Sequence, residues 1–524
     1  MPTSPLQLEF PSSRLLSDLL ILTPELTLVL TIVTMLVLRL VPAFDRWHLG
    51  YVSLLATMMA LLISSLQWLS FPLGNAAVAQ DLFSGMLVFD GLSAFSRMVI
   101  LGGAALCTLL SVLSKVPDAE DSADFHVLLL GGTIGTCLMA QAQHFLMLYV
   151  SVEMASVPGY VLAGFLKGKR QGSEAALKYV VYGGAASGLL LYGISLLCGR
   201  LGTGYLPDVC HSLHALMGHG GLDGLFWLSL SLILLGLAFK LSLVPMHFWC
   251  PDVFAGAAAE VGAFLAVVSK AGALAVLGRI ILMLMGSLPG SDTVSNVFAW
   301  SQLSQPLSIA LAVVAGITCT WGNLAAYPQT DLKRFWAYST IAHAGYLFMP
   351  LATLTREGLS ASLVYLVPYV VMNVGVFAIV CFVRNATHRE DLAAFAGLGQ
   401  RARGQAIALT ILIIGLVGLP PLAGFVGKYE VFSLLYQHGA QQPVLYVLLA
   451  VGVVNTLLAL GYYGKLLRVA WFDRADSTEP LGITFRQNLM VLALAMVVVF
   501  GIFFWDVLTQ WGTLVAVSGF QVRP

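Results

Sequence analysis

Residues 225–252 read LFWLSLSLILLGLAFKLSLVPMHFWCPD. The run stays predominantly apolar over the roughly twenty residues that a helix needs to cross a bilayer, so it predicts a span near residues 225–248. Lys240 lies well inside this span, where a charge is unfavourable. Pro245 follows and cannot donate the backbone hydrogen bond that an uninterrupted helix requires. The stretch therefore predicts a broken membrane helix that carries a buried cation.

The rest of the chain is also rich in apolar residues and poor in charged ones. Of its 524 residues 58% are apolar and 10% are charged, whereas a soluble domain carries about 25% charged residues. This leaves too little polar surface to cover a protein that faces water. We therefore predict an all-α polytopic membrane protein with about fourteen transmembrane helices. They are placed near residues 16–40, 50–71, 91–114, 125–142, 144–166, 173–199, 225–248, 257–286, 305–326, 328–352, 359–384, 404–437, 443–472 and 486–512.

The connections between these spans are too short to fold alone, so residues 1–524 are predicted to form a single membrane domain. The formal net charge is zero, which argues against a nucleic-acid partner. The seven cysteines are scattered and form no Cys-x-x-Cys pair, and no flavin or dinucleotide motif is present. We expect this chain to bind no metal and no cofactor.

The distribution of basic residues predicts the orientation. Cytoplasmic loops retain Lys and Arg, and the count in alternate loops divides sixteen to five. The richer set includes Lys115, Lys333, Arg403 and Arg474, and the poorer set comprises Arg14, Arg200, Arg279, Arg356 and Arg523. Both termini are therefore predicted on the non-cytoplasmic side.

Four charges are predicted near the middle of spans, namely Glu153, Lys240, Lys270 and Lys428. Each costs roughly 2.5 to 3.5 kcal/mol on insertion scales, and such groups commonly mark ion pathways. Burial can bring a lysine close to neutrality, whereas a guanidinium stays charged, so central lysines without a central arginine favour proton transfer. The alternative is a set of interhelical ion pairs or of side chains that reach the interface.

A second span is also expected to be broken. Lys428 follows Pro420 and Pro421, as Lys240 lies beside Pro245. The two breaks are five spans apart, which gives them opposite orientations in the membrane and is typical of inverted-repeat transporters. Kinks in packed helices are the alternative.

Further relay candidates are Lys178, His247 and His343. The imidazoles could pass a proton on. For Lys178, which lies near a helix end, snorkelling remains an equal alternative.

The motifs along residues 145–435 resemble subunit N of bacterial complex I, which is equivalent to subunit 2 of the mitochondrial and chloroplast enzymes. They occur in family order: EAALKY at 174–179, FKLSLVPMHFW at 239–249, PDVF at 251–254, DLKR at 331–334, AYSTIAHAGY at 337–346 and GLPPLAGFVGK at 418–428.

The resemblance implies two inverted five-helix repeats, formed by helices 4–8 and 9–13, with helices 7 and 12 broken. It divides the chain into N-terminal helices 1–3 (1–120), the first repeat (121–290), the second repeat (300–475) and a last helix (485–524). It also implies that Glu153 pairs with Lys240, that Lys270 links the halves and that Lys428 serves the exit.

The implied function is proton translocation in NADH-quinone oxidoreductase. NAD, flavin, iron–sulfur clusters and quinone would be bound by partner subunits. The partners would be neighbouring membrane subunits and the peripheral redox arm, in the bilayer of a bacterial inner membrane.

The sequence departs from the family before Lys270. Where the family has Glu, Thr-Pro and Gly-Pro, this chain has Ala255, Ala259-Glu260 and Val268-Ser269. The missing proline argues against a local break in the eighth helix, and Glu260 is a carboxylate without a family role.

Three other functions remain open. A multisubunit cation/proton antiporter or a related membrane-bound hydrogenase-type complex would share the fold and the charged positions. A standalone solute transporter would use similar broken helices but would need a pocket with convergent polar groups. A purely structural scaffold is disfavoured by the insertion cost of the four charges.

Overall fold

The computed structural model describes residues 12–41, 47–70, 79–118, 120–166, 170–218, 222–286, 294–475 and 479–518. Within these ranges the regular secondary structure is helical apart from one hairpin of two short antiparallel strands, β1 (Gln80–Leu82) and β2 (Leu87–Phe89). The all-helical polytopic architecture predicted from the sequence is confirmed.

The helices before residue 290 are α1 (Ser12–Ile21), α2 (Thr23–Arg39), α3 (Gly50–Ser70), α4 (Gly91–Ser114), α5 (Ser122–Gln141), α6 (Phe145–Ala163), α7 (Arg170–Leu201), α8 (Leu206–Gly218), α9 (Gly224–Leu241), α10 (Trp249–Gly256) and α11 (Ala259–Gly286).

The later helices are α12 (Val294–Ala326), α13 (Leu332–Phe348), η3 (Met349–Thr353), α14 (Arg356–Thr387), η4 (Leu392–Phe395), α15 (Leu398–Arg401), α16 (Arg403–Val417), α17 (Ala423–Gly439), α18 (Val444–Trp471), α19 (Phe485–Phe500), η5 (Gly501–Phe504) and α20 (Trp505–Ser518).

Eleven helices among the described residues are long and apolar enough to cross a membrane, or twelve if the bent pair α1–α2 counts as one span. Some predicted spans are not among these eleven because their helices are shorter: α13 and α17 have 17 residues each, and α16 has 15. The count of fourteen spans stays a prediction.

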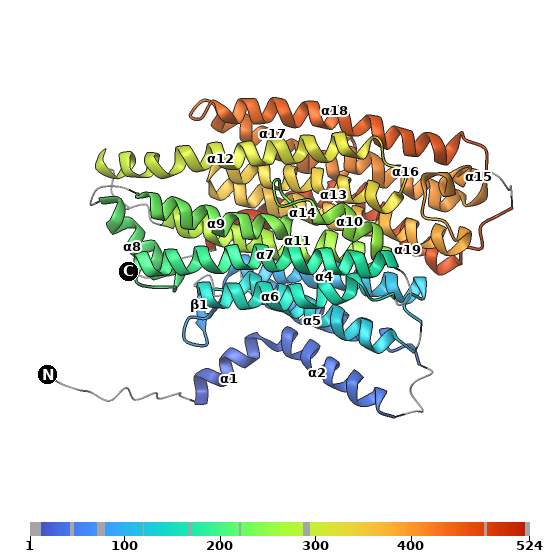
Figure 1. The fold of residues 1–524 in the computed structure, drawn as a ribbon, viewed down its shortest axis with the longest axis horizontal. Helices are drawn as coiled ribbons and strands as arrows, with labels where there is room; N and C mark the ends of the chain where they lie inside the picture. The colour runs from blue at the N-terminus through green and yellow to red at the C-terminus, as the bar shows by residue number, and fades with distance from the viewer. Residues whose placement is uncertain are drawn as a thin grey trace.

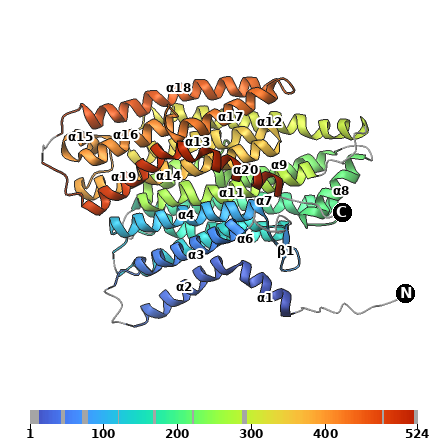
Figure 2. The ribbon, with the colours of Figure 1, turned by 180° about the vertical axis from the view of Figure 1, so that it is seen from behind.

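The long helices lie side by side, with α18 and α12 along one edge and the bent pair α1–α2 along the opposite edge (Figure 1). The view from behind shows the same order (Figure 2). In the interior, the apolar window of α11 is 100% buried and that of α14 is 89% buried, whereas that of α18 is 28% buried. The helix that carries Lys270 therefore has no face toward lipid.

The helix predicted at 16–40 is not one straight span. It bends by 78° between α1 and α2, because Pro24 opens α2 and cannot donate to the preceding turn. The carbonyl of Ile21 exposed by the bend accepts hydrogen bonds from Arg97 Nη1 and from Gln67 Nε2, each at 3.2 Å. The buried guanidinium thus stabilises the bend.

The eighth predicted span is a continuous helix. α11 runs unbroken from Ala259 to Gly286 and passes Lys270 near its middle. This agrees with the absence of a proline before Lys270, since the backbone ladder can then continue.

Candidate functional site

The first break separates α9 from α10. Lys240 is the penultimate residue of α9, and Ser242 ends that helix in a left-handed conformation with φ of 60°. Pro245 lies in the connection, where Val244 N donates a hydrogen bond of 3.0 Å to Thr318 Oγ1 on α12. Lys240 is 2% exposed. The break thus places an ammonium group inside the protein at the carbonyl end of a half-helix, where a cation is favoured.

The second break separates α16 from α17. α16 ends at Val417 and α17 begins at Ala423, with Pro420 and Pro421 between them. Lys428 Nζ donates a hydrogen bond of 3.0 Å to Val417 O, one of the carbonyls freed at the end of α16. The same Nζ lies 4.0 Å from the centre of the Tyr346 ring. Carbonyl and ring therefore solvate the buried cation without neutralising it.

α13 connects the central lysine to the second break. Lys270 Nζ donates a hydrogen bond of 2.8 Å to Thr340 O. His343 follows on the same helix, with its Nδ1 2.9 Å from Tyr365 OH and its Nε2 3.4 Å from Tyr463 OH. His343 interacts electrostatically with both Lys270 and Lys428. The structure thus brings Lys270, His343 and Lys428 together along one buried line.

Glu153 does not form the direct ion pair with Lys240 that the family resemblance implied. Its carboxylate on α6 accepts a hydrogen bond from the hydroxyl of Ser187 on α7, and the same hydroxyl lies 3.3 Å from Tyr149 OH. Lys240 Nζ is buried and has no hydrogen-bond partner among the described residues. The two groups still interact electrostatically. Glu153 is therefore oriented toward α7, and Lys240 is left as an unpartnered ammonium.

Three arginines contrast with these lysines because each is paired with a carboxylate. Their separations are 3.3 Å for Arg97–Glu25, 2.8 Å for Arg279–Asp90 and 2.9 Å for Arg384–Glu260. Among the described residues, no salt bridge joins a carboxylate to Lys240, Lys270 or Lys428. The interior therefore contains these three paired arginines, whose partners sequence reasoning did not identify, and, among the described residues, three central lysines without a carboxylate partner.

The pairing corrects two interpretations. Arg279 was assigned to a non-cytoplasmic loop, but it is 1% exposed within α11, and its guanidinium also donates to Ala140 O at 2.8 Å. Lys333 is 4% exposed, donates to Ala257 O at 3.1 Å and forms a salt bridge of 2.8 Å with Glu390. Glu260, which had no family role, is the acid of a bidentate pair. A carboxylate partner distant in sequence gives no local signal of such a pair.

The family model for the transmembrane region of NADH:quinone oxidoreductase and Mrp antiporters matches residues 142–458, more than half of the chain and the part that contains both breaks and all four central charges. The chain belongs to this family. Curated relatives of this chain are named NADH-quinone oxidoreductase subunit N, which confirms the resemblance to subunit N of complex I.

One relative is NADH-quinone oxidoreductase subunit N of Anaeromyxobacter sp., 35% identical over 498 residues, which cover 93% of this chain and 94% of the relative. Among solved structures, a chain of respiratory complex I from Thermus thermophilus with bound aureothin has a TM-score of 0.74 and 29% identity over 93% of this chain and 99% of that chain. A chain of the Mrp complex from Dietzia sp. has a TM-score of 0.80 and 19% identity over 96% and 97%, which shows a shared fold.

Two secondary candidates lie away from the central line of this antiporter-family subunit. Lys178 is 37% exposed at the side chain and forms salt bridges with Glu174 at 2.8 Å and Asp252 at 2.7 Å. His247 lies in the first break, with its ring 4.2 Å from Phe248 and 5.6 Å from Trp321 between centroids. Neither contacts the row formed by Lys270, His343 and Lys428.

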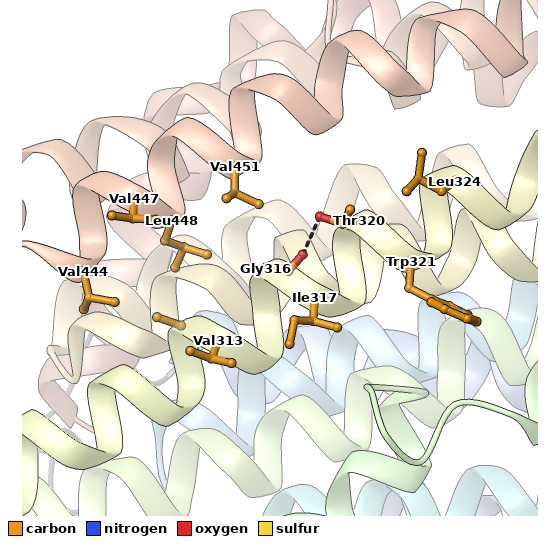
Figure 3. A pocket seen from close by; sticks show the side chains of 11 residues that line it. Val313, Gly316, Ile317, Thr320, Trp321, Leu324, Val444, Val447, Leu448 and Val451 are labelled. Carbon is orange, nitrogen blue, oxygen red and sulfur yellow. Dashed lines mark hydrogen bonds between the residues drawn. The ribbon is translucent and has the colours of Figure 1, made fainter.

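Two cavities differ in character. A cavity of about 370 Å³ between α12 and α18 is lined by aliphatic groups such as Val313 and Leu448 and by Trp321 (Figure 3). Its lining, all within the described residues, includes no ionisable group. The other, of about 360 Å³, is polar and lies among α7, α10 and α13, where Lys178, Asp252 and Arg334 line it. We call this polar cavity the vestibule.

Proposed function

We propose that this chain translocates protons as the subunit N of an NADH-quinone oxidoreductase, through a relay of Glu153, Lys240, Lys270, His343 and Lys428. The observation that carries the proposal is the contrast between the paired buried arginines and the three central lysines, Lys240, Lys270 and Lys428, which have no carboxylate partner among the described residues. An unpaired buried ammonium can release its proton, because the neutral amine is the form that burial favours. A guanidinium paired with a carboxylate cannot release a proton in this way, because it stays charged.

The contacts support the following order for the proposed relay. Lys240 at the first break and Glu153 on α6 form the entry side. Lys270 passes the proton toward α13 through the region of Thr340 and His343, where Tyr365 and Tyr463 supply hydroxyl groups. Lys428 receives it at the second break. The proposal also includes fourteen transmembrane spans and two inverted repeats, of which α5–α11 form the first and α12–α18 the second.

Redox chemistry belongs to partner subunits in this proposal. NAD, flavin, iron–sulfur clusters and quinone would be bound in the peripheral arm and at its junction with the membrane arm, and the chain would contact neighbouring antiporter-like and small membrane subunits. The expected location is the inner membrane of a bacterium. The Mrp-type antiporter is the second candidate, since an Mrp chain shares the fold. Co-purifying flavin and iron–sulfur subunits would exclude it.

The relay is tested first at Glu153. Glu153→Gln keeps the size and can still accept the Ser187 hydrogen bond, so the complex should assemble. Redox-driven proton uptake in vesicles, normalised to assembled complex, should fall by about tenfold or more, a conservative value for removal of a proton-transfer group. Glu153→Asp should retain part of the activity because the acid remains. Wild-type uptake by the Gln variant would show that Glu153 has a structural role alone.

The predicted orientation is tested by labelling. Cysteines placed at Lys115, Arg403 and Arg474 should react with an impermeant reagent only from the cytoplasmic side, and those at Arg200 and Arg356 only from the opposite side. A cysteine at the buried Lys333 should react slowly from either side. The reverse labelling pattern would overturn the topology.

A further inference from the structure

Four aromatic rings form a layer within the first repeat. Tyr179 on α7 stacks on Trp249 of α10, with centroids 4.5 Å apart and planes 10° from parallel. Phe239 on α9 lies 5.1 Å from Trp249, and Tyr160 on α6 meets the edge of Tyr179 at 4.8 Å. Tyr179, Phe239 and Trp249 are at most 3% exposed. We call this group the aromatic layer.

The aromatic layer lies between two sets of charges. On its inner side, Phe239 is followed by Lys240, and Tyr160 interacts electrostatically with Glu153. On its outer side, Tyr179 is preceded by Lys178, and Asp252 follows Trp249 by about one helical turn. Lys178 and Asp252 line the vestibule. The stacked rings thus connect the segments that line the vestibule with the segment that carries Lys240.

One carboxylate holds the layer closed. α10 has eight residues and is bounded by non-helical segments at 242–248 and 257–258. Asp252 accepts a hydrogen bond of 2.7 Å from Lys178 on α7 and one of 2.9 Å from Arg334 on α13. Trp249 Nε1 donates to Phe239 O at 3.0 Å. The short helix is thus held by polar contacts at the edge of the vestibule, and it also packs on its neighbours through buried residues such as Phe254 and Gly256.

We propose that α10 is a gate for proton entry: Trp249 seals Lys240 from the vestibule, and release of the Asp252 salt bridges lets the ring withdraw. This inference rests on the proposed function of Lys240, but access through the layer is a physical property that can be measured apart from proton transport. Trp249 and Asp252 are positioning residues in this mechanism. Stacked carbon faces offer water no hydrogen bond, so the closed layer excludes water from this side of Lys240.

Cys250 provides the probe. It is 0% exposed on α10, next to Trp249, and its Sγ lies 3.9 Å from Ala337 O of α13. The experiment uses the assembled complex with Cys250 as the only cysteine of this chain, and a small impermeant thiosulfonate applied from the face on which the vestibule opens. Trp249→Ala and Asp252→Asn should each raise the rate of Cys250 modification by about tenfold or more, because either change shifts the population toward the open layer.

Matched controls separate a gate from general loosening. Trp249→Phe keeps a ring in the stack and should react at close to the wild-type rate. Asp223→Asn removes a carboxylate bonded to Arg200 at 3.1 Å but can still cap α9 through Phe226 N, so it should leave Cys250 unreactive. Of the two Asn variants, only Asp252→Asn should show faster hydrogen exchange at the backbone amides of residues 249–256.

Assembled Trp249→Ala and Asp252→Asn variants that both react at the wild-type rate would overturn the gate. If Trp249→Ala does not assemble, Asp252→Asn decides alone. A Lys240→Met variant that pumps normally, combined with faster Cys250 modification in the gate variants, would refute the proposed relay and support the gate. The two proposals can thus fail separately.

Discussion

Replacement of Lys240 by methionine is expected to leave the subunit folded and to reduce redox-driven proton uptake by about tenfold or more. The ammonium is 2% exposed and has no hydrogen-bond partner among the described residues. Its removal therefore breaks no hydrogen bond and relieves the roughly 2.5 to 3.5 kcal/mol that a charge costs at a helix centre. The carboxylate of Glu153 keeps its bond from Ser187, so it is not orphaned.

Two comparisons sharpen this prediction. Lys240→Arg keeps the positive charge but cannot release a proton at physiological pH, so it should also lose proton uptake. Lys465→Met removes an exposed lysine whose Nζ lies 3.4 Å from Tyr327 O, and it should pump like the wild type. Uptake is measured in vesicles and normalised to assembled complex. Wild-type uptake by Lys240→Met would remove Lys240 from the relay.

Arg279→Met is expected to act on stability instead. Asp90 is 0% exposed and receives hydrogen bonds of 2.8 and 3.1 Å from the two terminal nitrogens of Arg279. Removal of one partner from such a pair destabilises by about 3 to 5 kcal/mol, because the other charge stays buried without compensation. The free energy of unfolding should therefore fall by this amount, and less complex should accumulate in membranes.

The double variant Asp90→Asn with Arg279→Met tests the cause. Asn can still accept the bond of 2.8 Å from Ser93 N that caps α4, while it removes the orphaned charge. Most of the lost stability should return, and the double-mutant cycle should give a coupling of about 3 kcal/mol, at the upper end of the usual range. Additive losses in the two single variants would show that the pair contributes little to folding.

The sequence predicted most of the helices and the charged positions because both signals are local. A lysine inside an apolar run is visible at Lys240, Lys270 and Lys428, and prolines mark the segments where α9 and α16 end. The bend at α1–α2 also had a local signal, Thr23-Pro24-Glu25, which is typical of a helix start. That signal was overlooked because the apolar run continues through it.

Pairs between distant residues had no such signal. Arg279 and Asp90 are 189 positions apart, and Arg384 and Glu260 are 124 apart, so no periodicity or spacing connects them. Arg279 near the end of an apolar run resembled a loop cation for that reason. The orientation of Glu153 toward Ser187 was equally hidden, because it depends on how α6 packs on α7.

The position of two ion pairs on α11 has a mechanical consequence. Glu260 near its start is bound to Arg384 of α14, and Arg279 near its end is bound to Asp90 at the start of α4. The helix is thus held near both of its ends. Lys270 lies ten residues from Glu260 and nine from Arg279, or about 15 and 14 Å along the axis. The two ion pairs oppose sliding of α11 along its own axis. We therefore expect Lys270 to keep its position along the helix axis, so that in the proposed relay any movement falls to the half-helices and side chains around it.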